Sequence, residues 1–328
     1  MSKLLLSSLT VAVLASFSAQ AQTAPAQPND FIEVFAKLFG EHKGIRKGHA
    51  KGVCAVGDFT PSAAATARFD AALFSSATVP VTYRFSMAGG NPNVPDYARS
   101  PRGLAAQFTL TDGSKHNIAT LTTPVFGAKN PENFLGLLKA SVPGADGKPD
   151  LAKIQAFRAA HPDTQPQAKW LAANPPPWSY ATAEYFGIHT FYLTDKSGEK
   201  VKIRWHLQPK DGVKGLAETE IAQQNANFLD ERLKQRLTDG MVEFDWIISL
   251  GEASDSDIDP SVQWPERPRL TAGTLRIKAS GDASCAECDS IESNGEGDAQ
   301  GCGCGGAVHS GHAVILPHSS RSGWGVAR

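Results

Sequence analysis

The chain lacks any excess of charge, and past its first residues it lacks long apolar runs. Lys and Arg number 32 against 33 Asp and Glu, which leaves a formal net charge of -1. A balanced chain has no basic field to attract nucleic acid or anionic lipid. No later stretch approaches the roughly 20 apolar residues that a membrane span requires. We therefore expect no nucleic-acid partner and no membrane anchor, and a neutral small substrate fits better.

Cysteine and tyrosine are scarce and unevenly placed. The chain has 5 of each, and four of the cysteines lie beyond residue 280, whereas no tyrosine follows Tyr192. Cys54 stands apart from the other cysteines, and we expect it to be a buried thiol, as isolated cysteines usually are. The last part of the chain therefore offers thiols but no phenol.

The first 21 residues have the layout of a secretory signal peptide. Lys3 precedes an apolar run over 4–17, and Ala19-Gln20-Ala21 provides a small-residue cleavage site before Gln22. We expect cleavage there and a location in a bacterial periplasm, which is an oxidising compartment. The remaining chain divides by composition into one large domain, 22–279, and a Gly, Ser and Cys-rich tail, 280–328.

Hydrophobic periodicity predicts helices and strands in an antiparallel arrangement. The predicted helices cover 29–40, 130–138, 150–160 and 217–237, and the predicted strands cover 79–86, 104–110, 116–121, 188–193, 201–207, 242–250 and 270–277. Pro162, Pro166 and the prolines at 175–177 are expected to prevent regular structure, with Trp178 and Tyr180 leading into a strand. The tail has no sustained hydrophobic periodicity of the helical or strand kind, so we expect little regular structure in it.

The stretch 46–61 concentrates residues that carry chemistry. His49 lies between basic residues, Arg46 precedes it by three positions, and the glycine-punctuated run 52–57 follows. Small residues allow the backbone to approach a large flat group, and an arginine suits an anionic one. The alternative is a surface histidine on a loop.

Several motifs in this chain resemble those of the haem catalases, in the same order. They are Arg46-Lys47-Gly48-His49-Ala50-Lys51-Gly52, Tyr83-Arg84-Phe85-Ser86, Ser100-Pro101-Arg102-Gly103-Leu104-Ala105, Thr123-Pro124-Val125-Phe126, Gly187-Ile188-His189-Thr190-Phe191, and Asp259-Pro260 with Trp264-Pro265. Their short spacing is similar to that of the small catalase-related peroxidases. The resemblance implies an α+β fold with an antiparallel β-barrel core of the catalase type, peripheral helices and an irregular C-terminal tail.

The resemblance also implies a function and a site. It implies a haem b peroxidase that reduces hydrogen peroxide or organic hydroperoxides with a small organic electron donor, in the response to oxidative stress. His49 is the implied acid and base, Arg46 and Arg84 the implied partners of the haem propionates. Val53 and Phe126 are further expected cofactor contacts, with core packing as the alternative for Phe126.

Three further residues, Arg102, His189 and His206, have other expected roles. Arg102 is either part of the site or a surface arginine. His189 and His206 are expected to be structural, because a strand histidine is more often a hydrogen-bonded core residue than a ligand.

Two departures from the catalase pattern weaken part of this prediction. The family's iron-binding tyrosine, preceded by an arginine four residues earlier, has no counterpart, so no metal ligand is assigned. Leu121 or Thr122 occupies the position of the family's distal asparagine, which favours peroxidase over catalase turnover. The alternative is a catalase-fold remnant or binding protein with impaired haem ligation. Because the resemblance ends near Ile277, we also hypothesise that the tail is read in a shifted frame.

The tail contains an alternative constellation of metal-binding residue types. A Cys-x-x-Cys pair followed by a second cysteine pair can bind zinc, whereas in an oxidising compartment the same thiols can form disulfides. The residues concerned are Cys285, Cys288, Cys302, Cys304, His309, His312 and His318. We expect neither arrangement to be important for function.

Overall fold

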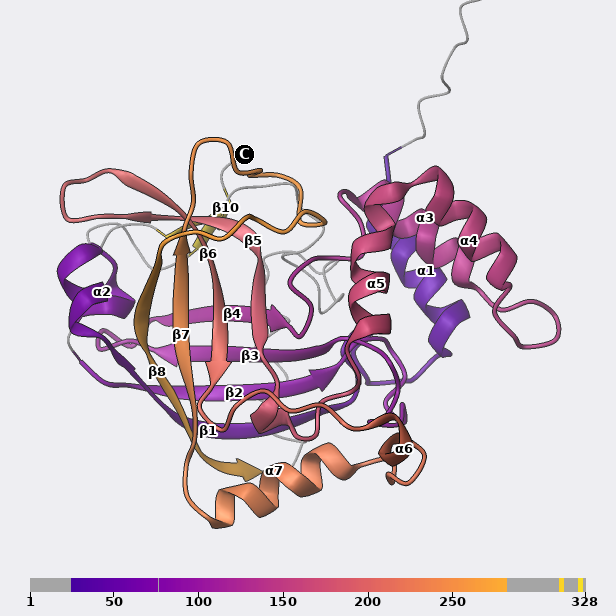
Figure 1. The fold of residues 1–328 in the computed structure, drawn as a ribbon, viewed down its shortest axis with the longest axis horizontal. Helices are drawn as coiled ribbons and strands as arrows, with labels where there is room; N and C mark the ends of the chain where they lie inside the picture. The colour runs from indigo at the N-terminus through magenta and orange to yellow at the C-terminus, as the bar shows by residue number, and fades with distance from the viewer. Residues whose placement is uncertain (1–24, 76, 282–312, 316–323, 327–328) are drawn as a thin grey trace, which may run out of the picture.

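Eight antiparallel strands close into a barrel in the computed structural model, which describes residues 25–75 and 77–281 and the backbone of 313–315 and 324–326. The barrel strands are β1 (Gly52–Pro61), β2 (Val79–Met87), β3 (Arg102–Thr109), β4 (Lys115–Leu121), β5 (Tyr185–Thr194), β6 (Lys200–Pro209), β7 (Val242–Leu250) and β8 (Arg269–Gly281). Each strand pairs with the next, and β1 also pairs with β8, which closes the barrel (Figure 1). The predicted barrel is confirmed.

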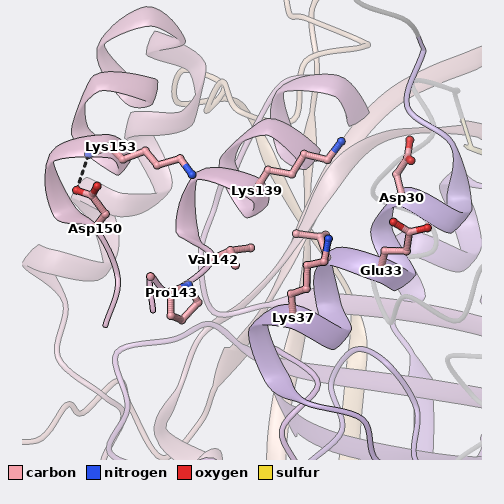
Figure 2. Close-up of a pocket in the computed structure, with 10 residues that line it drawn as sticks. Asp30, Glu33, Lys37, Lys139, Val142, Pro143, Asp150 and Lys153 are labelled. Atoms are coloured by element: carbon pink, nitrogen blue, oxygen red, sulfur yellow. Dashed lines mark hydrogen bonds between the residues drawn. The ribbon is translucent and has the colours of Figure 1, made fainter. Parts of the chain in front are cut away.

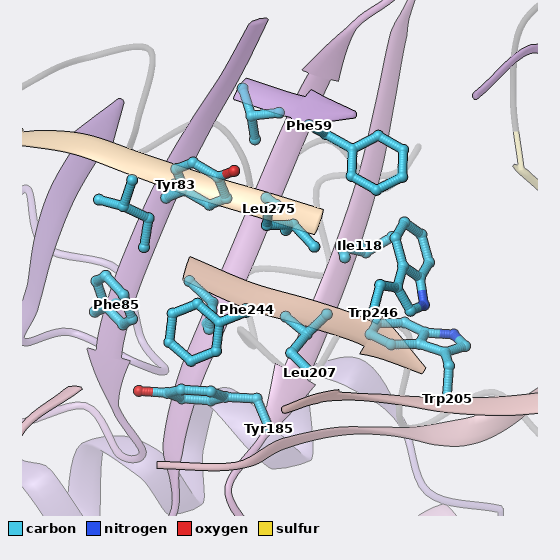
Figure 3. Close-up of a cluster of buried hydrophobic side chains, with 14 of the residues drawn as sticks. Phe59, Tyr83, Phe85, Ile118, Tyr185, Trp205, Leu207, Phe244, Trp246 and Leu275 are labelled. Atoms are coloured by element: carbon cyan, nitrogen blue, oxygen red, sulfur yellow. The ribbon is translucent and has the colours of Figure 1, made fainter. Parts of the chain in front are cut away.

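Alternation along the strands fills the barrel interior. In β2, the side chains of Tyr83, Phe85 and Met87 belong to the core and are fully buried. Successive side chains in a strand alternate, so the residues between them point to the other face. Aromatic residues from several strands meet in this core, among them Trp205 and Trp246, whose rings lie 5.2 Å apart (Figure 3). The core therefore sits inside the barrel, and the opposite strand faces remain for a site.

Seven α-helices and three short 3₁₀ turns surround the described barrel. They are α1 (Pro28–Phe39), α2 (Ala63–Arg68), η1 (Ala72–Phe74), α3 (Pro131–Ser141), α4 (Leu151–Ala160), η2 (Pro162–Thr164), α5 (Gln165–Ala173), η3 (Tyr180–Thr182), α6 (Glu218–Ile221) and α7 (Phe228–Thr238). Asn130 caps α3 by accepting from the N–H of Asn133, as its sequence predicts. Helices α1 and α3 pack together through Phe31, Val34, Phe35 and Leu135 beside the barrel (Figure 1).

Three local predictions are wrong. Helix α5 forms despite Pro166, because the first turn of a helix needs no intrahelical N–H donors. Tyr180 lies in η3 and not in a strand. The single helix predicted over 217–237 is two helices, α6 and α7.

The segments at both ends of the chain can be described only in part. Two short strands, β9 (Ala313–Ile315) and β10 (Trp324–Val326), pair with each other, and β9 pairs with β5. The expected signal peptide, most of the expected irregular tail with its possible frame shift, and its cysteine cluster lie outside the described residues. Within the described chain, no helix is both long and apolar enough to cross a membrane.

A buried histidine in the barrel predicts sensitivity to acid. His116 on β4 lies against the ring of Phe108, and burial lowers its pKa to about 3. In the unfolded chain its pKa is about 6.5, so the unfolded state binds the proton first as the pH falls. We expect the free energy of unfolding to decrease between about pH 6.5 and pH 3, by up to about 1.4 kcal/mol per pH unit from this residue. Denaturant titrations at several pH values, with His116→Gln showing a shallower dependence, test this.

Candidate active site

His49 is held in a strained, buried position just before β1. Its φ of 50° makes it a left-handed residue without being glycine, which costs conformational energy. The side chain is only 2% exposed, and Nδ1 lies 2.8 Å from the hydroxyl of Ser86 on β2. The alternative of a surface histidine on a loop is therefore wrong.

Ser86 stands in the middle of a row that crosses three strands. Its backbone partners are Gly52 on β1 and Gly103 on β3. Residues that face each other in neighbouring strands share a face of the sheet. The row lies on the strand face opposite the barrel interior, since the neighbouring Phe85 belongs to the interior core. His49 is therefore seated over the outer face of β2 and β3.

Arg84 lies on the same face of β2 as Ser86. It is 3% exposed, and one of its terminal nitrogens is 3.4 Å from the carbonyl oxygen of Ala50, the residue after His49. The guanidinium also contacts Gly52 so closely that a Cβ at that position would lie 2.6 Å from it. The structure thus brings together Arg84 and His49 as the sequence predicts. Arg46, three residues before His49, is half-buried.

A buried network of charges anchors the segment around His49. Lys51 forms an ion pair of 2.7 Å with Asp96, whose carboxylate also accepts from the N–H of Leu229. Arg102 is 2% exposed and donates to the carbonyl oxygens of Asp96 and Ser100. Burial raises the pKa of Asp96 and lowers the pKa of Arg102 to about 10. The alternative of a surface arginine at position 102 is wrong, because the guanidinium lies inside the molecule.

Apolar residues adjoin the row on its β4 side. Leu121 is the backbone partner of Gly103, and it packs with Phe126 and Ile188 in a small cluster that includes Phe134 at its edge. The ring of Phe126 lies 4.8 Å from that of Phe134. Phe126 thus lies at the apolar edge of the site and also packs against Phe134 and its neighbours in this cluster.

Val53 is not brought to this face. It pairs with Phe85 and belongs to the interior core of the barrel. The expectation that it contacts a cofactor beside His49 is corrected, because adjacent residues of a strand point to opposite faces and Gly52 already occupies the outer one.

Helix α5 holds the segment that follows β4. The indole N–H of Trp170 donates to the carbonyl oxygen of Thr122, and the amide of Gln167 donates to Thr123 and Val125. The hydroxyl oxygen of Thr122 accepts from the N–H of Arg102 at 3.0 Å. Sequence reasoning missed these supports because Pro162, Pro166 and the prolines at 175–177 argue against a helix, although Gln167 and Trp170 are spaced three residues apart, as two residues on one helical face would be.

Other candidate residues of the sequence have structural surroundings. Burial lowers the pKa of His189 and of His206 to about 4 each, so both imidazoles are neutral at ordinary pH, as expected for structural histidines. Cys54 is disulfide-bonded, and the expectation of a free thiol there is wrong.

Four tyrosines are poorly suited to be phenolates. All 5 tyrosines of the chain fall within the described residues, and burial raises the pKa of Tyr83, Tyr180, Tyr185 and Tyr192. The hydroxyls of Tyr83 and Tyr185 are occupied by carbonyl oxygens, and that of Tyr192 donates to Asp257 at 2.6 Å. Desolvation disfavours the charged phenolate at each of these four positions.

A pocket of about 410 Å³ lies between α1 and the connection from α3 to α4 (Figure 2). Its lining residues are Asp30, Glu33, Val34, Lys37, Lys139, Val142, Pro143, Gly144, Asp150 and Lys153. The charges of the three lysines and three carboxylates among them balance, and none of these residues belongs to a barrel strand. Such a rim presents little net charge to an ion. Among the described residues no cluster of three His, Cys, Asp or Glu is arranged to hold a metal ion.

Comparison with known proteins gives a consistent set of matches. The family model described as Catalase matches residues 19–255. The catalase-related peroxidase of Synechococcus elongatus is 40% identical over 266 residues, which cover 80% of this chain and 78% of that protein. The catalase-related peroxidase of Mycolicibacterium paratuberculosis is 35% identical over 251 residues, covering 76% of this chain and 79% of that protein.

Solved structures match in fold at lower identity. Catalase A from Saccharomyces cerevisiae superposes with a TM-score of 0.66 at 23% identity, covering 73% of this chain and 52% of that one. A bacterial catalase gives a TM-score of 0.66 at 21% identity, covering 82% of this chain and 55% of that one. The chain therefore spans about half the length of these solved catalases, and the likeness to them concerns the fold.

Proposed function

Because this chain belongs to the catalase family and is an oxidoreductase of the peroxidase and catalase class, we propose that it is a haem-dependent peroxidase. Its proposed substrates are hydrogen peroxide or organic hydroperoxides, and a small organic molecule is the proposed electron donor. The observation that carries the proposal is the buried His49, fixed by Ser86 and placed beside a buried arginine. Each of these three residues belongs to a motif that resembles the haem catalases.

The geometry of His49 suits the transfer of a peroxide proton. When the Nδ1–H group donates to the Ser86 hydroxyl 2.8 Å away, Nε2 carries no proton and acts as the base. The imidazole takes the proton from one peroxide oxygen at Nε2 and returns it to the departing oxygen, so that hydrogen peroxide releases water and an organic hydroperoxide releases an alcohol. A positioned general acid and base of this kind contributes about 10²- to 10⁴-fold to a rate.

The residues around His49 fit a haem on that side. The guanidinium of Arg84 lies over Gly52 and beside Ala50, the residue that follows His49. Arg84 and Arg46 would hold the propionates, since a guanidinium binds a carboxylate through paired hydrogen bonds. A bound haem would supply the iron at which the peroxide bond is cleaved.

The tyrosine that would bind the haem iron has no counterpart in this chain. Tyr83, Tyr180 and Tyr185 are buried, the pKa values of these three and of Tyr192 are raised by desolvation, and none of the chain's tyrosines follows Tyr192. A catalase-fold protein with impaired haem ligation is therefore the second candidate. These two candidates differ in whether the protein as written retains haem.

The residues beside His49 favour peroxidase over catalase turnover. Leu121 provides an apolar side chain next to Gly103, and the Thr122 hydroxyl already accepts from the N–H of Arg102. Neither is an amide that could orient a second molecule of hydrogen peroxide. We infer weak or absent catalase activity, with the reducing electrons coming from an organic donor.

We further propose a periplasmic location. The support is the layout of residues 1–21, with Lys3, an apolar run and Ala19-Gln20-Ala21. Mass measurement of the mature protein from the periplasmic fraction tests this, because cleavage would leave Gln22 as the first residue.

Loading the purified protein with haem tests the proposed function. We expect a stable Soret band and peroxide-dependent oxidation of an organic donor, with oxygen release from hydrogen peroxide at least about tenfold slower than donor oxidation. The donor assay and an oxygen electrode measure both rates on the same sample. A colourless protein that retains haem only after residues 280–328 are exchanged for those of a catalase-related peroxidase would favour the second candidate instead.

A further inference from the structure

Two site side chains lie directly on glycines that flank Ser86. The imidazole of His49 lies over Gly103, where a Cβ would be 3.1 Å from Nδ1 and 3.2 Å from Cε1. The guanidinium of Arg84 lies over Gly52, where a Cβ would be 2.6 Å from its central carbon. Both glycines are backbone partners of Ser86. We call the row Gly52, Ser86 and Gly103 the glycine trough.

Neither glycine is required by its backbone conformation. The positive-φ glycines of the described chain do not include Gly52 or Gly103. Glycine also weakens a strand interior, because it has no side chain to pack and loses more entropy on folding. A Cβ at Gly52 would meet the Arg84 guanidinium and, at 2.7 Å, the backbone oxygen of Phe85, and a Cβ at Gly103 would meet Ser86 and His49. These close approaches are the physical reason for a glycine at each position.

The contact at Gly103 is especially restrictive. A Cβ there would also lie 2.7 Å from the hydroxyl oxygen of Ser86, which is the group that holds His49. A methyl group at this position would thus press on both members of the hydrogen bond at once. The backbone of His49 is already at φ 50°, so the imidazole relieves this overlap by turning away from Gly103 and out of its buried position.

We propose that the glycine trough is a positioning device, in which Gly103 sets the depth of the His49 imidazole and Gly52 sets that of the Arg84 guanidinium. Because neither glycine has a side chain, the imidazole and the guanidinium can lie directly on the strands. Ser86, between the two glycines, fixes the imidazole by its hydrogen bond. Gly52 and Gly103 are therefore positioning residues. The effects of Gly52 on haem retention and of Gly103 on turnover rest on the proposed function, whereas the effect of Gly103 on the exposure of His49 does not.

The variant Gly103→Ala tests the seat of the imidazole. Overpacking of this kind is relieved by moving the ring, so we expect the rate of His49 carbethoxylation by diethyl pyrocarbonate to rise about tenfold or more in the protein without haem. Mass mapping of the peptide that contains His49 measures this. In the haem-loaded protein, kcat should fall about tenfold with KM within about twofold, because movement of Ser86 and of the ring away from Gly103 misplaces the imidazole.

A matched glycine elsewhere separates positioning from loss of stability. A Cβ at Gly136 on α3 would lie 2.5 Å from the ring of Phe157, so Gly136→Ala inserts the same methyl against a ring outside the site. It should lower the melting temperature without changing His49 modification. Equal His49 reactivity in Gly103→Ala, Gly136→Ala and the parent protein would overturn the proposal, whether or not haem binds.

A double variant gives an independent readout. Ser86→Ala removes the atom closest to the added methyl together with the hydrogen bond to His49, so it should itself increase His49 modification. Adding Gly103→Ala to Ser86→Ala should then change the rate of His49 modification by less than about twofold, because both substitutions act by displacing the His49 ring. Fully multiplicative effects would contradict a shared action on His49.

The proposed role of Gly52, which lies under Arg84, predicts a different phenotype. Gly52→Ala should weaken haem retention about tenfold or more by displacing a charge-assisted partner of a carboxylate, and it should leave the modification rate of His49 within about twofold of the parent. Haem transfer to apomyoglobin measures retention. If Gly52→Ala retains haem as the parent does, this half of the proposal is wrong; if the parent takes up no haem, the proposed function fails, and the modification data still decide the role of Gly103.

Discussion

His49→Ala, loaded with haem, is expected to lose about 10²- to 10⁴-fold in kcat for peroxide reduction. The imidazole is the group whose Nδ1 is fixed by Ser86 at 2.8 Å, and alanine supplies no atom that can carry the peroxide proton at the position of Nε2. Steady-state rates with a saturating organic donor measure the effect.

Two further variants make the His49 experiment specific. His161→Ala removes a histidine that stacks on Phe157 at the end of α4, and it should leave kcat unchanged. Ser86→Ala keeps the imidazole but removes its hydrogen-bond partner, so an intermediate loss of about tenfold is expected. A His49→Ala protein that binds haem and turns over at the parent rate would reject the catalytic role of His49.

Much of the barrel could be predicted because its strands alternate and its turns use glycine. The hairpin of β3 and β4 is one example, since Asp112-Gly113 separates two alternating runs and Gly113 adopts the expected positive φ of 82°. Helix α5 could not be predicted, because Pro166 predicts a break in regular structure although it occupies the first helical turn. Local propensity does not distinguish a proline that starts a helix from one that prevents it.

The candidate site was predictable in composition but not in arrangement. His49, Arg84, Ser86 and Gly103 all lie in the motifs that resemble catalases, yet the contact of His49 with Gly103 depends on the register of β2 against β3. Register is a tertiary property, set by which faces of the strands are buried. For the same reason, the placement of Val53 in the interior followed only from the pairing of β1 with β2.

The burial of Arg102 also depended on distant residues. Its charge is accommodated by the carbonyl oxygens of Ser100 and Asp96, and Asp96 is in turn held by Lys51 and by the N-terminal end of α7. Those partners come from separate parts of the chain. A buried charge requires such partners, but the sequence near Arg102 does not show that they converge.

Trp246→Ala is expected to destabilise the folded protein by about 3–5 kcal/mol, which corresponds to a decrease of roughly 10 °C in melting temperature. Trp246 is 1% exposed and lies at the centre of the aromatic core, with the ring of Trp205 at 5.2 Å and that of Phe59 at 5.6 Å (Figure 3). Residues from β1, β6 and β7 meet there, so a cavity at this point loosens both halves of the barrel. Thermal and urea unfolding of the protein without haem measure the loss independently of any activity.

Trp246→Phe distinguishes the lost volume from the lost polar group. The indole N–H of Trp246 is buried and makes no hydrogen bond to any residue that the structure describes, and leaving such a donor unpaired costs about 1–3 kcal/mol. Phenylalanine removes that donor and keeps most of the aromatic volume against Phe59 and Trp205, so the two effects oppose each other. We expect a net change below about 1.5 kcal/mol in either direction. A loss as large as that of the alanine variant would mean that the indole N–H has a partner that stabilises the barrel, such as an ordered water.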